Sequence, residues 1–233
     1  MDEAIHKVRK KMMDRANWAK ARGDIYKFLS AAFLEPPSRA LVTALSSNGL
    51  LEALENIFGH AAVDDLRLSV SQIQSDYESL DQEFQDLFMV PLGRYVTPYE
   101  AVYRDEREVG DDRVQGLLMG PSTLAVKQLY REAGAAVSED FKDLPDHVGL
   151  ELACMGFLCE AEAQAWVKED LDSVRRMRDF QKKLLHEHLL LWVPALCGRI
   201  RERAPGPYYR GIAGLTEAHL AREADALVSF AEV

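Results

Sequence analysis

The spacing of apolar residues is the feature that most constrains the fold of this chain, because they recur every three or four positions along almost its whole length. Near the start, Trp18, Ile25, Leu29 and Phe33 fall on one face of a helix expected from about Asp14 to Leu34. No segment shows the convincing alternation of apolar and polar residues that indicates a half-buried strand. The sequence therefore predicts an all-α protein.

Residues that start and stop helices divide this pattern into about nine to ten helices. Ser38 follows two prolines and has a hydroxyl that can cap a helix N-terminus. Gly134 suits the end of another helix. Two long helices are expected after it, about Asp146–Lys168 and Leu171–Trp192, with a short one after Pro194. We expect one globular helical bundle over residues 1–233.

The helical pattern breaks between about residues 90 and 120, where prolines and glycines interrupt any period. Long irregular segments inside compact domains are uncommon and tend to be functional, and a subdivision of the chain would fall here. The segment from Phe84 to Tyr103, which overlaps the start of this region, is also rich in aromatic side chains, namely Phe84, Phe88, Tyr95, Tyr99 and Tyr103. These rings either plug the core or line an apolar groove for an extended or helical peptide.

Charge and cysteine content limit the environment and the partners. Acidic residues outnumber basic ones 38 to 28, giving a net charge of −10, so nucleic acid is not an expected partner. The three cysteines form no CxxC pair and suit a reducing compartment. The longest apolar run, Leu189 to Cys197, is about half a membrane span. We expect a cytoplasmic protein without stable membrane insertion.

No motif for catalysis or cofactor binding is present in the sequence. It lacks a GxxxxGK[ST] phosphate loop and a GxGxxG turn after a strand. His186 and His188 are two positions apart, whereas a helical zinc pair needs its histidines at i and i+4. We therefore expect no bound metal or organic cofactor and no enzymatic activity.

A second group of polar residues marks the start of one long helix. Asp146 is placed to cap this helix, and Glu151 falls on the same face as His147. A cap alone explains Asp146. Alternatively, two carboxylates and an imidazole that titrates near neutral pH, in a partly exposed cluster, would hold a cationic or amide-rich ligand.

Four motifs across about residues 18–227 resemble the TorD/DmsD/NarJ family of redox-enzyme maturation chaperones. They are Phe84-Gln85-Asp86-Leu87-Phe88 with Pro91, Pro98-Tyr99-Glu100-Ala101-Val102-Tyr103, Pro145-Asp146-His147 with Glu151-Leu152, and Phe180 to Pro194 with Leu185, His188, Leu189 and Trp192. The resemblance implies an all-helical chaperone. Such proteins bind the twin-arginine leader or the apo form of a molybdopterin-containing oxidoreductase and delay export until its cofactor is inserted.

The resemblance also implies where a leader peptide binds. Carried over by position, the peptide-binding residues are Phe84, Leu87, Phe88, Pro98, Tyr99, Tyr103, Pro145, Asp146, His147 and Glu151. Ala101 departs from the family, because many relatives have serine there. The competing functions are a GTP-responsive helical protein and an accessory subunit of the oxidoreductase, and either a monomer or a domain-swapped dimer is compatible with the family.

Overall fold

A computed structural model describes residues 2–47, 49–109, 112–135 and 142–229. In this part of the chain the all-α prediction is confirmed. The π-helical turn η1 extends α5, and the π-helical turn η2 joins α9 to α10. The α-helices therefore form ten continuous rods. The helices are α1 Asp2–Leu34, α2 Arg39–Ser46, α3 Gly49–Phe58, α4 His60–Ser75, α5 Glu78–Phe84, η1 Gln85–Met89, α6 Glu100–Arg104, α7 Pro121–Ala133, α8 Val148–Val167, α9 Leu171–Leu184, η2 Leu185–Leu189, α10 Leu190–Arg203 and α11 Pro207–Ser229.

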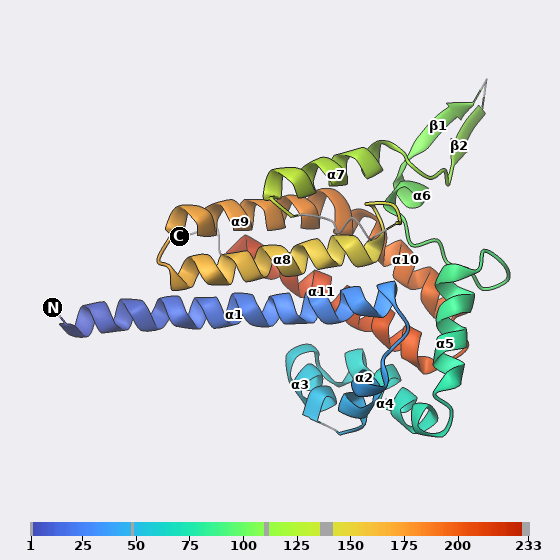
Figure 1. Ribbon diagram of the computed structural model, residues 1–233, viewed down its shortest axis with the longest axis horizontal. Coiled ribbons are helices and arrows are strands. Elements are labelled where there is room, and N and C mark those ends of the chain that lie inside the picture. Colours follow the sequence, from blue (N-terminus) through green and yellow to red (C-terminus); the bar gives the residue numbers. More distant parts are fainter. Residues whose placement is uncertain (1, 48, 110–111, 136–141, 230–233) are drawn as a thin grey trace.

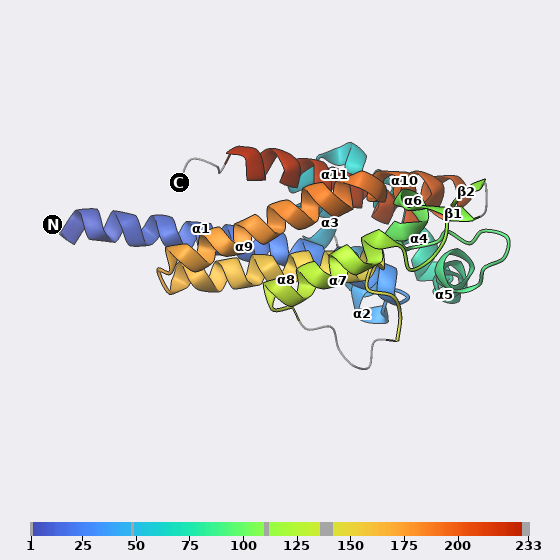
Figure 2. The same cartoon turned by 90° about the horizontal axis from the view of Figure 1, so that it is seen from above.

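The long helices run side by side along the long axis of the molecule. Figure 1 shows α1 beside α8, and α8 beside α9, with α7 along the far edge. Helix α11 packs on α10 and α4 and forms a second layer, which Figure 2 shows from above. Helices α2 to α5 gather at one side of this bundle. Among the described residues, no helix is long and apolar enough to span a bilayer.

Two glycines allow α1 and α8 to approach closely. A Cβ atom built on Gly23 would lie 3.1 Å from the carbonyl oxygen of Gly156, and one built on Gly156 would lie 3.3 Å from that of Gly23. Both carbonyl groups belong to helix backbone, which moves only if the helices separate, and Lys27 Cγ would lie 3.2 Å from the added atom on Gly156. The N-terminal helix is therefore packed directly against the helix that begins at the conspicuous Asp146-His147 motif.

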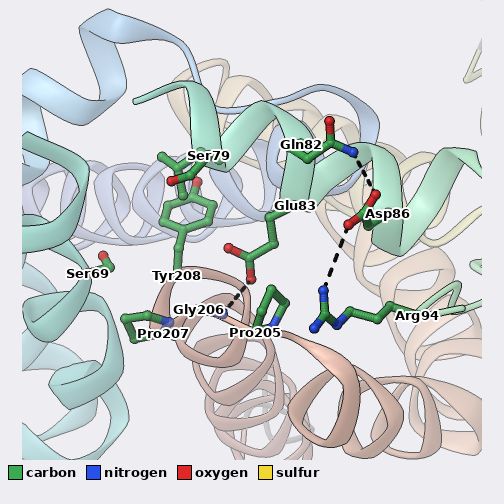
Figure 3. Close-up of a pocket in the computed structure, with 11 residues that line it drawn as sticks. Ser69, Ser79, Gln82, Glu83, Asp86, Arg94, Pro205, Gly206, Pro207 and Tyr208 are labelled. Atoms are coloured by element: carbon green, nitrogen blue, oxygen red, sulfur yellow. Dashed lines mark hydrogen bonds and ion pairs between the residues drawn. The ribbon is translucent and has the colours of Figure 1, made fainter. Parts of the chain in front are cut away.

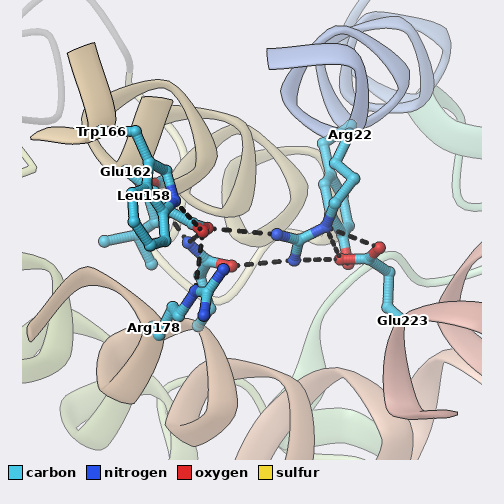
Figure 4. Close-up of polar contacts among 8 residues, drawn as sticks. Arg22, Leu158, Glu162, Trp166, Arg178 and Glu223 are labelled. Atoms are coloured by element: carbon cyan, nitrogen blue, oxygen red, sulfur yellow. Dashed lines mark hydrogen bonds and ion pairs between the residues drawn. The ribbon is translucent and has the colours of Figure 1, made fainter. Parts of the chain in front are cut away.

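A buried network of charged side chains joins four helices (Figure 4). Arg22 on α1 donates to Glu223 on α11 at 2.8 Å and to Glu162 on α8 at 3.2 Å. Glu162 also accepts hydrogen bonds from Arg178 and Gln181 on α9, at 2.7 and 3.0 Å. Two arginines balance two glutamates, so the network is neutral as well as hydrogen-bonded, which buried charges require.

Several helix boundaries follow the expected signals. The Ser38 side chain accepts from the Leu41 amide at the start of α2, and Gly134 ends α7 with a φ of 76°. Pro194, in contrast, does not end a helix, because α10 continues through it after the π turn of η2. The expected boundary at Trp192 is therefore wrong.

The irregular segment contains more regular structure than the sequence pattern indicates. Strand β1, Glu106–Val109, pairs antiparallel with β2, Asp112–Gln115, in the register Glu106 to Gln115. The absence of strands was thus predicted too broadly. Four-residue strands are too short to show a clear alternation, and this hairpin projects from the bundle (Figure 1).

Candidate functional site

The two segments that stand out in the sequence are joined to each other in the structure. Residues 98–101 lie against the start of α8: the Val148 amide donates to the Pro98 carbonyl at 2.9 Å, and the Glu100 amide donates to the Asp146 carbonyl at 3.0 Å. Tyr99 and His147 form an isolated antiparallel bridge, with ring centroids 5.4 Å apart. We call this junction of residues 98–101 and 145–148 the clasp.

Buried carboxylates lie at and beside the clasp. Asp146, Glu100 and Glu151 are each 0% exposed. The Asp146 side chain accepts from the Ala101 amide at 3.0 Å, and Glu151 accepts from the Trp192 indole at 3.1 Å. These hydrogen bonds satisfy one oxygen of each carboxylate, whereas the second oxygen of Asp146 and of Glu151 is buried without a partner. The carboxylates therefore fix backbone and indole groups in place and do not face solvent.

Burial also shifts the pKa values of ionisable side chains in and beside the clasp. It raises the pKa of the Asp146 carboxyl, and it raises the pKa of Glu151 well above its usual value with the Glu100 charge adding to the effect. Burial lowers the pKa of His147 to about 4. Desolvation penalises the charged form in each case. The expectation that His147 titrates near neutral pH is wrong, because its ring is enclosed.

The cap of α8 also differs from the expectation. His147, not Asp146, is the N-cap residue, since its Nδ1 accepts from the Gly149 amide at 3.0 Å. The Asp146 side chain instead accepts a hydrogen bond from the Ala101 amide in the first turn of the short helix α6. The prediction of a partly exposed Asp146 is therefore wrong.

The aromatic residues divide into a buried set and an accessible set. Phe84, Leu87 and Phe88 belong to the hydrophobic core, where Phe88 contacts Phe33 and Tyr209 edge-on. Among these residues, the plug interpretation describes the observed packing. Of the residues expected to bind a peptide, Tyr99, Tyr103 and Pro145 are half-buried and reach the surface. The others are buried, namely Phe84, Leu87, Phe88, Pro98, Asp146, His147 and Glu151.

The Tyr99 and Tyr103 rings are held in place by their hydroxyl groups. Tyr99 donates to the exposed Asp143 at 2.7 Å, and Tyr103 donates to the Thr97 carbonyl at 3.0 Å. The Tyr103 ring also lies 5.4 Å from the Trp192 ring. Two oriented, half-exposed rings on one short segment suit apolar contact with a peptide.

Sequence reasoning missed the most exposed apolar residues of this region. Met89, Val90 and Leu92 are 58%, 42% and 74% exposed and lie at the turn that follows η1. It also missed Glu83, which is buried on the inner face of α5. The helical spacing of Leu80, Glu83 and Leu87 was the available signal, because it places a carboxylate between two core leucines.

The geometry thus combines an all-helical fold with an accessible aromatic segment that rests on a buried polar clasp. Comparison with known proteins gives the family of the chain. Residues 48–198 match the model of the nitrate reductase delta subunit family. The chaperone protein TorD of Shewanella pealeana is 23% identical over 220 residues, which cover 89% of this chain and 90% of the relative.

Two further relatives match a shorter part of the chain. The Tat proofreading chaperone DmsD of Salmonella typhi is 29% identical over 145 residues, 62% of this chain and 60% of DmsD. The selenate reductase assembly chaperone of Thauera selenatis is 30% identical over 152 residues, 63% of this chain and 71% of the relative. This chain belongs to the nitrate reductase delta subunit family, which includes TorD and DmsD. It is a chaperone and not an enzyme, as its family and relatives show.

Proposed function

We propose that this chaperone acts in the cytoplasm on the catalytic subunit of a molybdopterin-containing oxidoreductase. It binds the twin-arginine leader or the apo form of that subunit and assists cofactor insertion before export or assembly. The names of two relatives support this proposal, because one is a Tat proofreading chaperone and another an assembly chaperone for selenate reductase.

The observation that carries the leader-binding part is the composition of residues 89–103. This segment offers exposed apolar residues at its start and two half-exposed tyrosine rings, Tyr99 and Tyr103, near its end. A leader with a basic head and an apolar body needs apolar surface close to negative charge. The chain carries a net charge of −10, which favours the approach of a basic peptide.

Replacing Tyr99 by alanine tests this surface. We expect a synthetic twin-arginine leader to bind the Tyr99→Ala protein roughly tenfold more weakly, because truncating an interface aromatic costs on the order of 1–2 kcal/mol. Tyr99→Phe is the matched control, since it keeps the ring and removes only the hydroxyl bond to Asp143. Calorimetric titration into each folded full-length protein gives the affinities.

Three results would count against the proposal. Equal affinity of wild type and Tyr99→Ala would remove Tyr99 from the leader site. A rise in melting temperature with GTP, and none with leader peptide, would favour the nucleotide-responsive alternative, because a ligand stabilises the native state in proportion to its affinity. Constant stoichiometry of this chain in the mature oxidoreductase would favour an accessory subunit.

A further inference from the structure

A cavity of about 340 Å³ lies between the α5–η1 rod and the turn that joins α10 to α11. Figure 3 shows Glu83 and Asp86 on one wall, Gly206 and Tyr208 on the other, and Arg94 at the edge. None of the residues of the clasp lines this cavity. Its chemistry is therefore separate from the buried carboxylates described above.

Glu83 supplies a buried negative charge to the cavity wall. The residue is 6% exposed, and one of its oxygens accepts from the Gly206 amide at 3.3 Å (Figure 3). A Cβ atom at position 206 would lie 2.8 Å from the other oxygen, so glycine at this position leaves room around the carboxylate. Within the described residues, no lysine, arginine or histidine forms an ion pair with Glu83. A buried carboxylate in this state lacks a counter-ion.

Tyr208 gives an independent indication that the cavity takes a polar ligand. Its side chain is 0% exposed and lines the cavity, and its hydroxyl has no hydrogen-bond partner. A buried hydroxyl without a partner costs free energy that a ligand donor would recover. Asp86 adds a second carboxylate nearer the mouth, where it accepts from Gln82 at 2.7 Å and lies 4.0 Å from Arg94.

We propose that this cavity binds the guanidinium group of one arginine side chain of the client leader, with Glu83 as its counter-ion and the Tyr208 oxygen as a second acceptor. This inference rests on the proposed function. A planar guanidinium presents five N–H donors in a fixed fork, which suits two acceptors on different elements better than an ammonium does. A metal ion is a poorer occupant, because the described residues contain no group of three or more ligands suited to one.

The neighbouring surface suits the residues that would follow such an arginine. Met89, Val90 and Leu92 are exposed on the turn that leaves the same rod as Glu83 and Asp86. The cavity and this turn thus combine a cation site with an apolar surface over a few residues of chain. A basic head in the cavity leaves the apolar body of the peptide next to the turn.

The charge of Glu83 gives the site a pH dependence. Burial raises the pKa of the Glu83 carboxyl, against the opposing effects of the Gly206 amide and the Arg94 and Arg210 charges, while Asp86 raises it further. The other ionisable groups that line this cavity are Asp86, Arg94 and Tyr208. A guanidinium favours the ionised carboxylate, so leader affinity rises with pH through the pKa of Glu83.

The test is calorimetric titration of a synthetic twin-arginine leader into full-length protein variants. Glu83→Gln keeps an acceptor for Gly206 and removes the charge, and we expect affinity to fall roughly 10- to 100-fold and its rise with pH to disappear. Tyr208→Phe should weaken binding severalfold. Glu78→Gln, an exposed change on the same helix, is the control for net charge and should leave affinity unchanged.

Arg94→Gln is a second variant, and its expected effect on leader affinity is opposite to that of Glu83→Gln. It removes an exposed positive charge beside the cavity and should tighten binding about threefold, a result that misfolding would not produce. Citrulline in place of each leader arginine in turn identifies the occupant. For the arginine that enters the cavity, the citrulline peptide should bind wild type and Glu83→Gln equally.

The outcomes separate this inference from the proposed function. Leader binding that is unaffected by Glu83→Gln, or by Arg94→Gln if Glu83→Gln does not fold, overturns the cavity and leaves the chaperone function intact. An equal effect of Glu78→Gln and Glu83→Gln also overturns it, because only net charge would then matter. Failure of wild type to bind any leader peptide overturns both the leader site and the cavity.

Discussion

Burial decides the hydrogen-bonding role and the protonation state of several ionisable side chains in this protein more than their neighbours in sequence do. Asp146 and His147 are residue types expected at a surface site. In the structure, however, Asp146 accepts from the Ala101 amide and His147 caps α8. His219 is a more extreme case. It is 1% exposed, both ring nitrogens lack hydrogen-bond partners, and its ring lies 4.3 Å from that of Tyr26. Such a ring is tolerated only while it is neutral.

His219 should therefore make the protein sensitive to mild acid. Burial lowers the pKa of His219 from 6.5 to about 4, with the Arg22 and Arg222 charges lowering it further and Glu223 opposing them. Between these pH values the folded state binds fewer protons than the unfolded state. The free energy of unfolding consequently rises with pH through this window, and the contribution is fully present above about pH 6.5. Each pH unit is about 1.4 kcal/mol, so one such histidine accounts for roughly 3 kcal/mol.

Replacing His219 by phenylalanine isolates this effect. The ring contacts with Tyr26 and Phe58 are retained, whereas the titrating group is removed. We expect wild type to lose more stability than His219→Phe on going from pH 7 to pH 4.5, by up to about 3 kcal/mol. Urea unfolding at a series of pH values measures the difference. If the two proteins differed by the same amount at every pH, His219 would not be a source of the acid sensitivity.

Whole helices were easier to predict than the way they join. Ser38 and Gly134 mark their helix ends by local chemistry that does not depend on the rest of the fold, and both predictions are confirmed. Pro194 misled because α10, which follows the π turn η2, continues through it. The helical spacing of Phe84, Leu87 and Phe88 puts the three side chains on one face. Spacing does not reveal whether the face they occupy is covered, and here the core covers it.

The close approach of α1 and α8 was also invisible in the sequence, because a helical glycine looks the same whether it is crowded or open. Gly23→Ala should lower the free energy of unfolding by about 1 kcal/mol, since overpacking against the Gly156 carbonyl outweighs the better helix propensity of alanine. Gly198→Ala is the matched control. It has no atom within 4 Å of the added methyl group and should raise the same quantity by about 0.5–1 kcal/mol. Equal effects of both substitutions in urea unfolding would show that the helices do not meet at Gly23.

The molecule as a whole is held together by contacts between its two ends. Helix α1 begins the chain and α11 ends it, and both enter the same buried network with α8 and α9 (Figure 4). No sequence pattern marks this network, because Arg22 and Glu223 are 201 positions apart. Hydrogen bonds depend on direction more sharply than apolar packing does, and here they connect α1, α8, α9 and α11 at fixed positions. The contribution of the network to net stability is a separate question, since desolvating each charge offsets much of the attraction.

Paired substitutions in the network measure how strongly Arg22 and Glu223 are coupled in stability. Arg22→Met leaves Glu223, which is 2% exposed, buried without its cation, and we expect a loss of about 3–5 kcal/mol in the free energy of unfolding. Adding Glu223→Met removes the orphaned carboxylate and leaves Glu162 paired with Arg178 at 2.7 Å, so the remaining pair is neutral. The double variant should then recover a large part of the loss. Urea unfolding at neutral pH gives all four free energies of the cycle, and single-variant losses that simply add in the double variant would mean that Arg22 and Glu223 contribute to stability independently.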